Sequence, residues 1–224
     1  MTRALFLSGG GRYADPWHPF PETSAEVTGI LEAEGIDVHL TEDVDAALET
    51  LASGPPPELL VVNVGSPRDG GSSPGTAAAR EGLRRWAHLG GGALLALHSS
   101  STSFTDSPDW ETALGGRWVR GTTMHPEYGP ARILLEAPLL AGLPDFTVDD
   151  ERYTRLRTAE DVLVHARHVH DGVLHPLVWS RERRMPGGSA RTFYDALGHD
   201  AASYTEQVHR EVLRRGGSWL LRRA

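Results

Sequence analysis

Short apolar segments alternate with helical patterns through the first part of the chain, and this alternation constrains the fold more than any other feature. Four strands are expected, at residues 4–7, 37–40, 59–64 and 93–97. Three helices are expected between them, beginning near Thr23 (with capping-box spacing to Glu26), Asp43 and Thr76. The strands at 59–64 and 93–97 are apolar throughout, which is typical of a parallel sheet covered on both faces. Such sheets bind ligands beyond the carboxyl ends of their strands.

The second half of the chain is less regular. Strands are expected at residues 132–135, 162–166 and 191–194, and a closing helix at 204–215. The pair Asp171-Gly172 between two β-like segments predicts a hairpin. Because no linker, repeat or low-complexity tract separates the two halves, we expect one domain over residues 1–224.

Two missing residue types exclude whole classes of chemistry. The chain has no cysteine, which excludes disulfides, thiolate zinc sites, iron–sulfur clusters and a cysteine nucleophile. It also has no lysine, since all 22 basic residues are arginine. A pyridoxal-phosphate Schiff base and a Walker phosphate-binding loop both require lysine, so neither cofactor site is expected.

The charge balance is acidic, with a formal net charge of −8 and a pI near 5.7. The only basic concentration is Arg181, Arg183 and Arg184 in one loop, so no nucleic-acid partner is expected. Apolar segments such as 93–97 are too short to span a membrane, and Met1–Leu7 does not resemble a signal peptide. A soluble cytoplasmic protein without a membrane partner is the expectation.

Two patterns suggest ligand sites that we set aside. Gly9-x-Gly11-x-x-Ala14 matches a loose dinucleotide fingerprint, but prolines at 16, 19 and 21 delay the following helix, so no nucleotide is expected. Histidines crowd one predicted hairpin, at positions 165, 168, 170 and 175. Strand alternation sends His165 to the opposite face from His168, so we expect a solvated hairpin and not a zinc site. His88 and His209 are expected on helix surfaces.

The most informative segment is Gly90–Ser100, in which three glycines lead into an apolar strand that ends at His98. This is the pattern of a strand feeding a sharp turn that presents one residue at the top of a sheet. A histidine there can act as a metal ligand or as a general acid–base. Ser99 is an alternative nucleophile for a serine hydrolase, although the glycine that such an elbow needs after it is missing.

Other polar groups follow strands or fill loops that could reach His98. They are His125, the Asp149-Asp150-Glu151 run with Tyr153, and His199. Three histidines with a carboxylate suit Zn²⁺, Mn²⁺ or Fe²⁺. Two histidines with a carboxylate could equally move protons without a metal, and the sequence leaves both readings open.

Five blocks of sequence together resemble the ThuA-like (trehalose utilisation) family. They are Gly90–Ser100, Trp110-x3-Leu114-Gly115-Gly116 leading to His125, Asp150-Glu151-x-Tyr153, Trp179, and Arg191-Thr-Phe-Tyr194-x2-Leu197-Gly-His199. The resemblance extends over residues 5–222. It implies the fold of class I glutamine amidotransferases, a flavodoxin-like three-layer α/β sandwich with a mostly parallel central sheet. Glutaminase activity is excluded, because His98 stands where those enzymes carry the nucleophilic cysteine.

The resemblance also implies the site and a role in sugar metabolism. Its motif positions correspond to His98, His125, Glu151, Tyr153 and His199. We expect catalysis by His98, Glu151, Tyr153 and His199, and the ligands of a divalent metal, if one binds, are expected to be His98, His125, His199 and Glu151. The amino-terminal loop around His18 has no clear counterpart, so His18 is left open.

Aromatic and acidic side chains are expected to bind the sugar. Flat faces for a pyranose could come from Trp17, Trp110, Trp118, Tyr153 and Trp179, while Asp106, Asp150 and Arg152 could bind its hydroxyls. The alternative for the tryptophans is the core, which we expect for Trp86, Trp118 and Trp219.

Two functions remain open at this point. The first is an enzyme that isomerises, dehydrates, hydrates or hydrolyses a disaccharide, glycoside or keto-sugar, with metal or histidine and glutamate as catalysts. The second is a non-catalytic sugar-binding or regulatory module on the same fold. A homodimer is expected by analogy with similar sheets.

Overall fold

The structure, a computed structural model, describes residues 2–89, 92–136, 138–186 and 188–223. Nine strands form one sheet in the order β2-β1-β3-β4-β11-β10-β9-β6-β7. Their bounds are β1 Thr2–Ser8, β2 Ile36–Thr41, β3 Leu59–Asn63, β4 Ala93–Leu97, β6 Gly129–Leu135, β7 Phe146–Asp150, β9 Leu163–His170, β10 Val173–Met185 and β11 Gly188–Asp195. The strands β5 (Gly116–Arg117) and β8 (Arg157–Thr158) pair separately.

Five α-helices cover the sheet. They are α1 Phe20–Ala33, α2 Val44–Thr50, α3 Ala77–His88, α4 Pro108–Leu114 and α5 Gln207–Leu220. Neighbouring residues of β11 show that two of them lie on opposite faces, because adjacent side chains of a strand point in opposite directions. Thr192 donates to the Ala113 carbonyl of α4, whereas Phe193 packs against Gly216 of α5.

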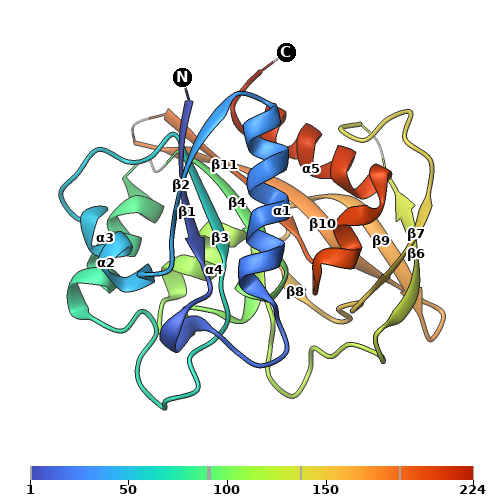
Figure 1. The fold of residues 1–224 in the computed structure, drawn as a ribbon, viewed down its shortest axis with the longest axis horizontal. Coiled ribbons are helices and arrows are strands. Elements are labelled where there is room, and N and C mark those ends of the chain that lie inside the picture. The colour runs from blue at the N-terminus through green and yellow to red at the C-terminus, as the bar shows by residue number, and fades with distance from the viewer. Residues whose placement is uncertain (1, 90–91, 137, 187, 224) are drawn as a thin grey trace.

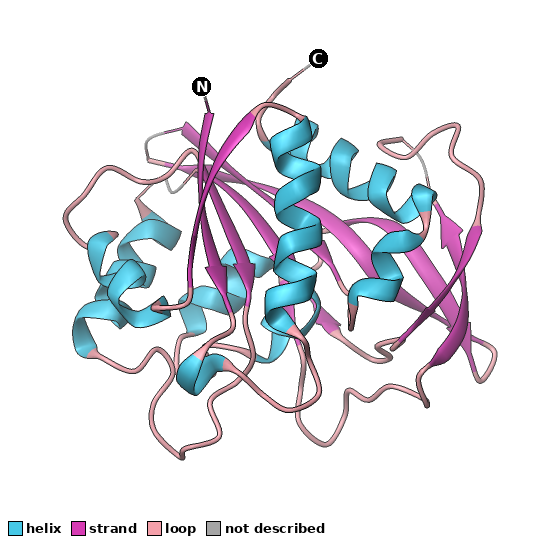
Figure 2. Cartoon of the chain, in the orientation of Figure 1, coloured by secondary structure: helices cyan, strands magenta, loops and turns pink. Residues whose placement is uncertain are grey.

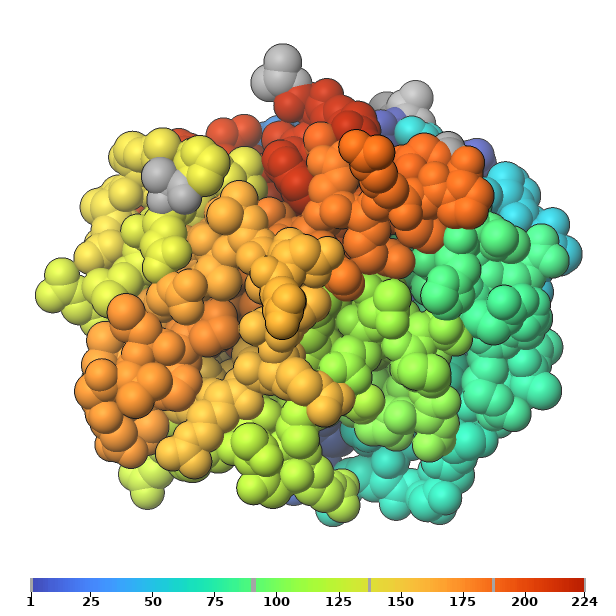
Figure 3. Space-filling view, turned by 180° about the vertical axis from the view of Figure 1, so that it is seen from behind, coloured from blue at the N-terminus to red at the C-terminus, as the bar shows by residue number. Residues whose placement is uncertain are grey.

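The helices therefore form two layers around the sheet. Helices α1 and α5 contact each other, and α2, α3 and α4 pack in series. Figures 1 and 2 show α1 in front of the sheet beside α5, and the view from behind in Figure 3 shows the green segments of α3 and α4. The expected three-layer α/β architecture is confirmed.

The half of the sheet formed by β2, β1, β3, β4 and β11 is parallel throughout. Every residue of β3 and β4 is buried, as their unbroken apolar sequences predicted. Asp43 and Thr76 cap the next helices by accepting hydrogen bonds from Ala46 and Ala79, which confirms both expected helix starts. The glycine turn expected after α3 includes Gly90 and Gly91, which lie outside the described residues.

One predicted cap is wrong. Helix α1 begins at Phe20, with Pro21 in its first turn, and not after Thr23. Thr23 lies inside the helix, where its hydroxyl donates to the Pro19 carbonyl. The proline at this position is compatible with the first helical turn, because no intrahelical bond is lost there.

The remaining strands, β10, β9, β6 and β7, are antiparallel to their neighbours. The predicted hairpin is confirmed between β9 and β10, where Asp171 and Gly172 both have positive φ angles, 49° and 74°. The sequence did not indicate the full length of β10, because arginines and a proline interrupt its apolar pattern. It also gave no sign of β7 or α4.

Four histidines that were expected to be exposed are instead buried, at positions 165, 168, 175 and 209. His165 bonds to Ser180, His168 bonds to the Tyr153 carbonyl, and His209 pairs with Asp195 at 2.8 Å. Each side chain has a polar partner for at least one ring nitrogen, which offsets part of the cost of burial, although Nδ1 of His165 and of His168 has no hydrogen-bond partner among the described residues. His88, by contrast, is exposed as predicted and contacts Asp109.

Among the described helices, none is both long and apolar enough to cross a membrane.

Candidate functional site

The site forms where the carboxyl ends of β4 and β11 meet. These two strands are paired, with Leu97 opposite Asp195, so the residues that follow them emerge at the same edge. His98 comes directly after β4 and has a φ of 38°, a conformation that is uncommon for any residue but glycine. The sharp turn predicted from the sequence is therefore present, and it presents His98 at the top of the sheet.

Both ring nitrogens of His98 have fixed partners. The side chain is 1% exposed, with Nδ1 at 2.7 Å from the Ala196 carbonyl oxygen and Nε2 at 3.0 Å from the Tyr153 hydroxyl. Since a carbonyl only accepts, Nδ1 carries the proton and Nε2 carries the lone pair. Burial raises the pKa of Tyr153 well above its usual value, so this hydroxyl stays protonated and donates to Nε2.

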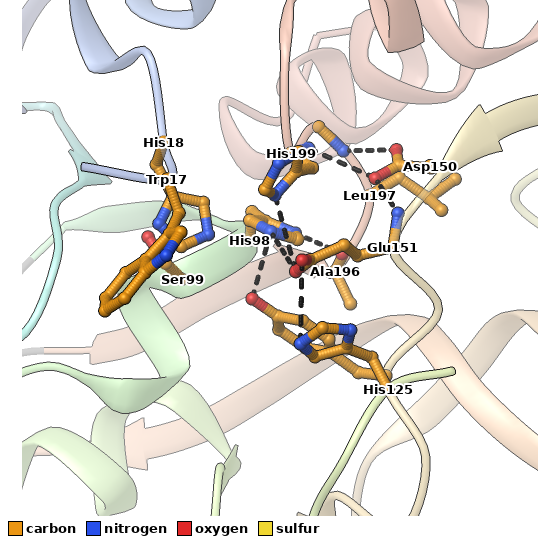
Figure 4. A network of polar contacts seen from close by, with 12 residues as sticks. Trp17, His18, His98, Ser99, His125, Asp150, Glu151, Ala196, Leu197 and His199 are labelled. Atoms are coloured by element: carbon orange, nitrogen blue, oxygen red, sulfur yellow. Dashed lines mark hydrogen bonds and ion pairs between the residues drawn. The ribbon is translucent and has the colours of Figure 1, made fainter. Parts of the chain in front are cut away.

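Glu151 lies at the centre of the histidines (Figure 4). One carboxylate oxygen lies 3.5 Å from His98 Nε2 and 3.4 Å from His199 Nδ1, and the other lies 3.5 Å from His125 Nε2. Burial opposes ionisation, but interactions with His199 and His98 outweigh it and lower the pKa of Glu151 far below its usual range. Burial also lowers the pKa of His199, and the Glu151 carboxylate more than offsets this, so that the net shift is upward.

The loop that carries His199 is held in place by hydrogen bonds to Asp150, which is fully buried. Its carboxylate accepts hydrogen bonds from the backbone of Gly198 at 2.7 Å and of His199 at 3.2 Å. It also accepts from the Ser203 hydroxyl at 2.5 Å. Asp150 thus positions the loop after β11 and does not face a ligand.

His18, which the sequence left open, belongs to the site. Its Nδ1 lies 2.8 Å from both carboxylate oxygens of Asp15, and its ring centroid is 5.0 Å from His98 and 4.9 Å from His199. Burial lowers the pKa of His18, and the neighbouring histidines lower it further against the effect of Asp15. The spacing Asp15-x-x-His18 was the available signal, but the proline-rich loop gave no basis for placing it near His98.

Four of these side chains could hold a metal ion. His18, His98, Glu151 and His199 each offer one ligand atom, and these atoms all lie within 4.8 Å of one another. Within the described part of the chain, two buried ring nitrogens of the group have no hydrogen-bond partner. They are His18 Nε2 and His199 Nδ1, and the latter has only the ion-pair contact with Glu151. This group differs from the expected set of His98, His125, His199 and Glu151, since it includes His18 and not His125.

A cavity of about 580 Å³ opens beside the group. His18, Glu151, Tyr153 and His125 line it, together with Trp17, whose side chain is 59% exposed. Trp118 also lines it, so the expectation that Trp118 belongs only to the core is wrong. In Figure 3 the dark-blue amino-terminal segment is visible between the teal and yellow-green segments, where these chain regions meet.

Three residues expected to bind substrate lie elsewhere. Trp110 and Trp179 are buried in the core, where their indole nitrogens donate to the carbonyls of Ser100 and Leu114. Asp106 accepts from the backbone of Ser73 and does not line the cavity. These assignments are corrected, since no face of either tryptophan is available to a ligand.

Two further residues have structural contacts instead of the expected roles. The Ser99 hydroxyl is buried and donates to the Val64 carbonyl at 3.2 Å, so no base is positioned to activate it. Arg152 reaches the Pro130 carbonyl and does not line the cavity. Trp86 is buried as expected, whereas Trp219 is only partly buried beneath the Arg191 guanidinium.

Comparison with known proteins gives one family match over nearly the whole chain. A family model described as ThuA, trehalose utilisation, matches residues 3–220. No curated protein matches.

Solved structures show the same fold at low sequence identity. A ThuA-like protein from Bacteroides uniformis superposes with a TM-score of 0.70 at 18% identity, covering 98% of this chain and 91% of that one. A glutamine amidotransferase from Thermotoga maritima gives a TM-score of 0.55 at 10% identity and covers 98% of both chains. A β-galactosidase from Halorubrum lacusprofundi gives 0.56 at 12% identity, covering 99% of this chain and 30% of that one.

Proposed function

This chain belongs to the ThuA (trehalose utilisation) family, and from that premise we propose that it is a metal-dependent enzyme of carbohydrate metabolism. The proposed substrate is a disaccharide, a glycoside or a keto-sugar. The observation that carries the proposal is the group of three imidazoles and one carboxylate facing a cavity of about 580 Å³.

The donor set fits one divalent metal. Three imidazoles with one carboxylate suit Zn²⁺, Mn²⁺ or Fe²⁺. His18 Nε2 is buried with no hydrogen-bond partner among the described residues, so without an ion it would lose its hydrogen bond to water without compensation. Such an ion would supply Lewis-acid chemistry, by polarising a substrate carbonyl or lowering the pKa of a water molecule.

The hydrogen-bond partners of His18 and His98 determine which ring nitrogen of each is available to a metal. Asp15 accepts the Nδ1 proton of His18, and the Ala196 carbonyl accepts the Nδ1 proton of His98. Nε2 of each ring then carries the lone pair. That of His98 accepts from the Tyr153 hydroxyl, a hydrogen bond that a metal bound at this nitrogen would replace. Partners of this kind fix the tautomer and the orientation of metal-binding histidines.

His125 is the candidate proton carrier. Its Nδ1 lies 2.9 Å from the Pro126 carbonyl, which holds the proton there and leaves Nε2 free to accept one in the neutral ring. Nε2 lies 3.5 Å from Glu151, and the ring lines the cavity with 38% of its side chain exposed. A partly exposed imidazole beside the reacting atoms can take a proton from a sugar and release it to solvent.

The indoles of Trp17 and Trp118 provide the apolar surface of the cavity. A pyranose presents a face of C–H groups that packs on an aromatic ring, while its hydroxyls remain available to polar groups. A sugar resting on these rings would have its ring carbons close to Glu151 and His125, which line the same cavity.

Turnover of sugars by the metal-loaded protein tests this proposal. Disaccharides, glycosides and keto-sugars are incubated separately with the protein, and products are followed by proton NMR. We expect one class to react, and His125→Gln to reduce kcat by about 10²-fold or more while metal binding is retained. His88→Gln, at an exposed histidine of α3, is the matched control and should leave kcat unchanged.

The alternative is a sugar-binding module without catalysis. It would be supported, and the enzyme contradicted, if the metal-loaded protein bound a sugar measurably but converted none of the three classes.

A further inference from the structure

A second cavity adjoins the first. It has a volume of about 390 Å³ and shares Ser66, Thr102, Trp118 and Arg120 with the cavity beside the histidines. We call the cavity beside the histidines the inner cavity and this one the outer cavity. A substrate larger than one sugar ring, or a ring with a substituent, would extend from the inner into the outer cavity.

Every charged residue that lines the outer cavity is an arginine. These are Arg117, Arg120 and Arg157, within a chain whose net charge is −8. The inner cavity adds Arg68, and its acidic side chains, Asp15 and Glu151, are both engaged by histidines. The charge around the outer cavity is therefore opposite to that of the molecule as a whole.

Two of the arginines share one counter-ion. Arg157 makes two hydrogen bonds to the Glu111 carboxylate, of 2.7 and 2.8 Å, and Arg117 lies 3.7 Å from the same group. One carboxylate between two guanidinium groups leaves an excess of positive charge. Glu111 itself does not line the cavity.

Arg120 lines both cavities. Among the residues that the structure describes, its side chain makes no ion pair and no hydrogen bond. The loop that carries it is well ordered by its own contacts, since Thr123 bonds to the backbone of both Val119 and Arg155 and Trp118 bonds to Ser101. A guanidinium group with free N–H donors on a fixed loop can bind a carboxylate or a phosphate through two parallel hydrogen bonds.

We propose that the outer cavity is a subsite for an anionic group, a carboxylate or a phosphate, on the sugar that the inner cavity binds. Arg120 is its direct ligand, and Arg117 and Arg157 supply further positive charge. The substrate class is then a sugar acid or a sugar phosphate and not a neutral sugar. This inference rests on the proposed function for the sugar itself.

Binding of matched sugars tests the subsite, with the fluorescence of the tryptophans as readout. Glucose, glucuronate and glucose 6-phosphate are titrated into the protein, and so is inorganic phosphate alone. We expect one anionic sugar to bind at least tenfold more tightly than glucose, because a charge-assisted pair contributes that much. The preferred anion distinguishes the carboxylate from the phosphate.

Variants test whether Arg120 causes the preference for an anionic sugar over glucose. Arg120→Gln should abolish the tenfold preference, whereas Arg132→Gln, at an exposed arginine of β6, should leave it unchanged. Equal binding of neutral and anionic sugars by the unmodified protein, or a preference that survives Arg120→Gln, would overturn the subsite.

Failure of the sugar function is distinguishable from failure of the subsite. If no sugar binds but inorganic phosphate does, and Arg120→Gln abolishes that binding, the anion subsite stands and the sugar function fails. Because phosphate also binds metal ions, only the component that Arg120→Gln removes counts. If neither sugars nor phosphate bind in an Arg120-dependent way, the subsite is overturned.

Discussion

Single hydrogen bonds decide which atoms of the site are available to a ligand. His18 illustrates this, because its proton is held on Nδ1 by Asp15 while Nε2 is buried without a partner. Without the carboxylate, the ring could rotate or take the other tautomer, and the lone pair would leave the group. The function of His18 thus depends on Asp15, which is not itself one of the proposed metal ligands.

Replacing Asp15 with asparagine should weaken metal binding by about 10- to 100-fold, the usual effect of removing a carboxylate behind a metal-binding histidine. Stability should change little, since Asp15 lies in a loop before α1. Competition with a chromogenic chelator measures the affinity, and Asp37→Asn, at an exposed aspartate of β2, is the control. Unchanged affinity in Asp15→Asn would exclude His18 from the ligand set.

Among single residues, the sequence predicted the position of those that follow strands better than the position of those in loops. His98 and His199 follow β4 and β11, two paired parallel strands, so the sheet brought these two residues to one edge. Glu151 follows β7, an antiparallel strand that the sequence did not indicate. His18 was missed because no periodic pattern fixes the path of a proline-rich loop. Trp110 and Trp179 were misassigned because the residue type does not reveal whether an indole packs in the core or faces a cavity.

At the scale of elements, the loop after β11 determines where His199 lies. Asp150, at the end of β7, binds the backbone of Gly198 and His199, and thereby connects the antiparallel half of the sheet to the parallel half. Gly198 has a φ of 100°, and a Cβ atom at this position would collide with the Tyr204 hydroxyl. Only glycine allows the loop to make this turn.

Gly198→Ala should lower the free energy of unfolding by about 1–3 kcal/mol, the usual cost of a strained backbone conformation, and should also weaken metal binding. Gly29→Ala is a suitable control, because it lies within α1 and its Cβ would meet no atom within 4 Å. Gly29→Ala should leave the free energy of unfolding unchanged or raise it by up to about 1 kcal/mol. Denaturant unfolding measures both, and equal stability of the two variants would contradict this account of the loop.

The parallel elements were predictable because their apolar sequences are continuous and their helices have capping residues. The strands of the antiparallel half were harder to predict from the sequence. In β10, four consecutive charged residues, Arg181–Arg184, follow the apolar segment, and a bulge near Pro176 interrupts the register. The long-range contacts that stabilise β7 and α4, such as those of Asp150 and Trp110, leave no local pattern in the sequence.

At the scale of the whole molecule, buried histidines with opposite pKa shifts limit stability on both sides of neutral pH. Burial lowers the pKa of His165 to about 4. His209 is also subject to burial, but the charge and the hydrogen bond of Asp195 outweigh it, and its pKa is raised. The first histidine therefore binds a proton less readily in the fold than in the unfolded chain, and the second binds it more readily.

Acid should destabilise the protein through His165. Below its unfolded pKa of 6.5 the unfolded chain binds the proton more readily than the native protein does, so stability is lost as the pH falls from about 6.5 to about 4. The loss attributable to this residue is roughly 3 kcal/mol. In His165→Gln the stability should fall less steeply over this range, and a slope equal to that of the unmodified protein would contradict the assignment.

Base should destabilise the protein through His209. Its raised native pKa means that the native state holds a proton that the unfolded chain releases, so this contribution is complete below pH 6.5 and is lost as the pH rises through the native value. Urea unfolding at a series of pH values should show stability declining above pH 6.5. In His209→Gln this part of the decline should disappear, and its persistence would show that another group causes it.

The central claim is that His18, His98, Glu151 and His199 hold one divalent metal, and metal content tests it most directly. Protein purified without chelator is analysed by mass spectrometry, beside His98→Ala and Glu151→Gln, with circular dichroism to confirm that each variant is folded. The account predicts about one equivalent of zinc, manganese or iron in the unmodified protein and little in either folded variant. An absence of stoichiometric metal from the unmodified protein, or a full equivalent retained in both variants, would contradict it.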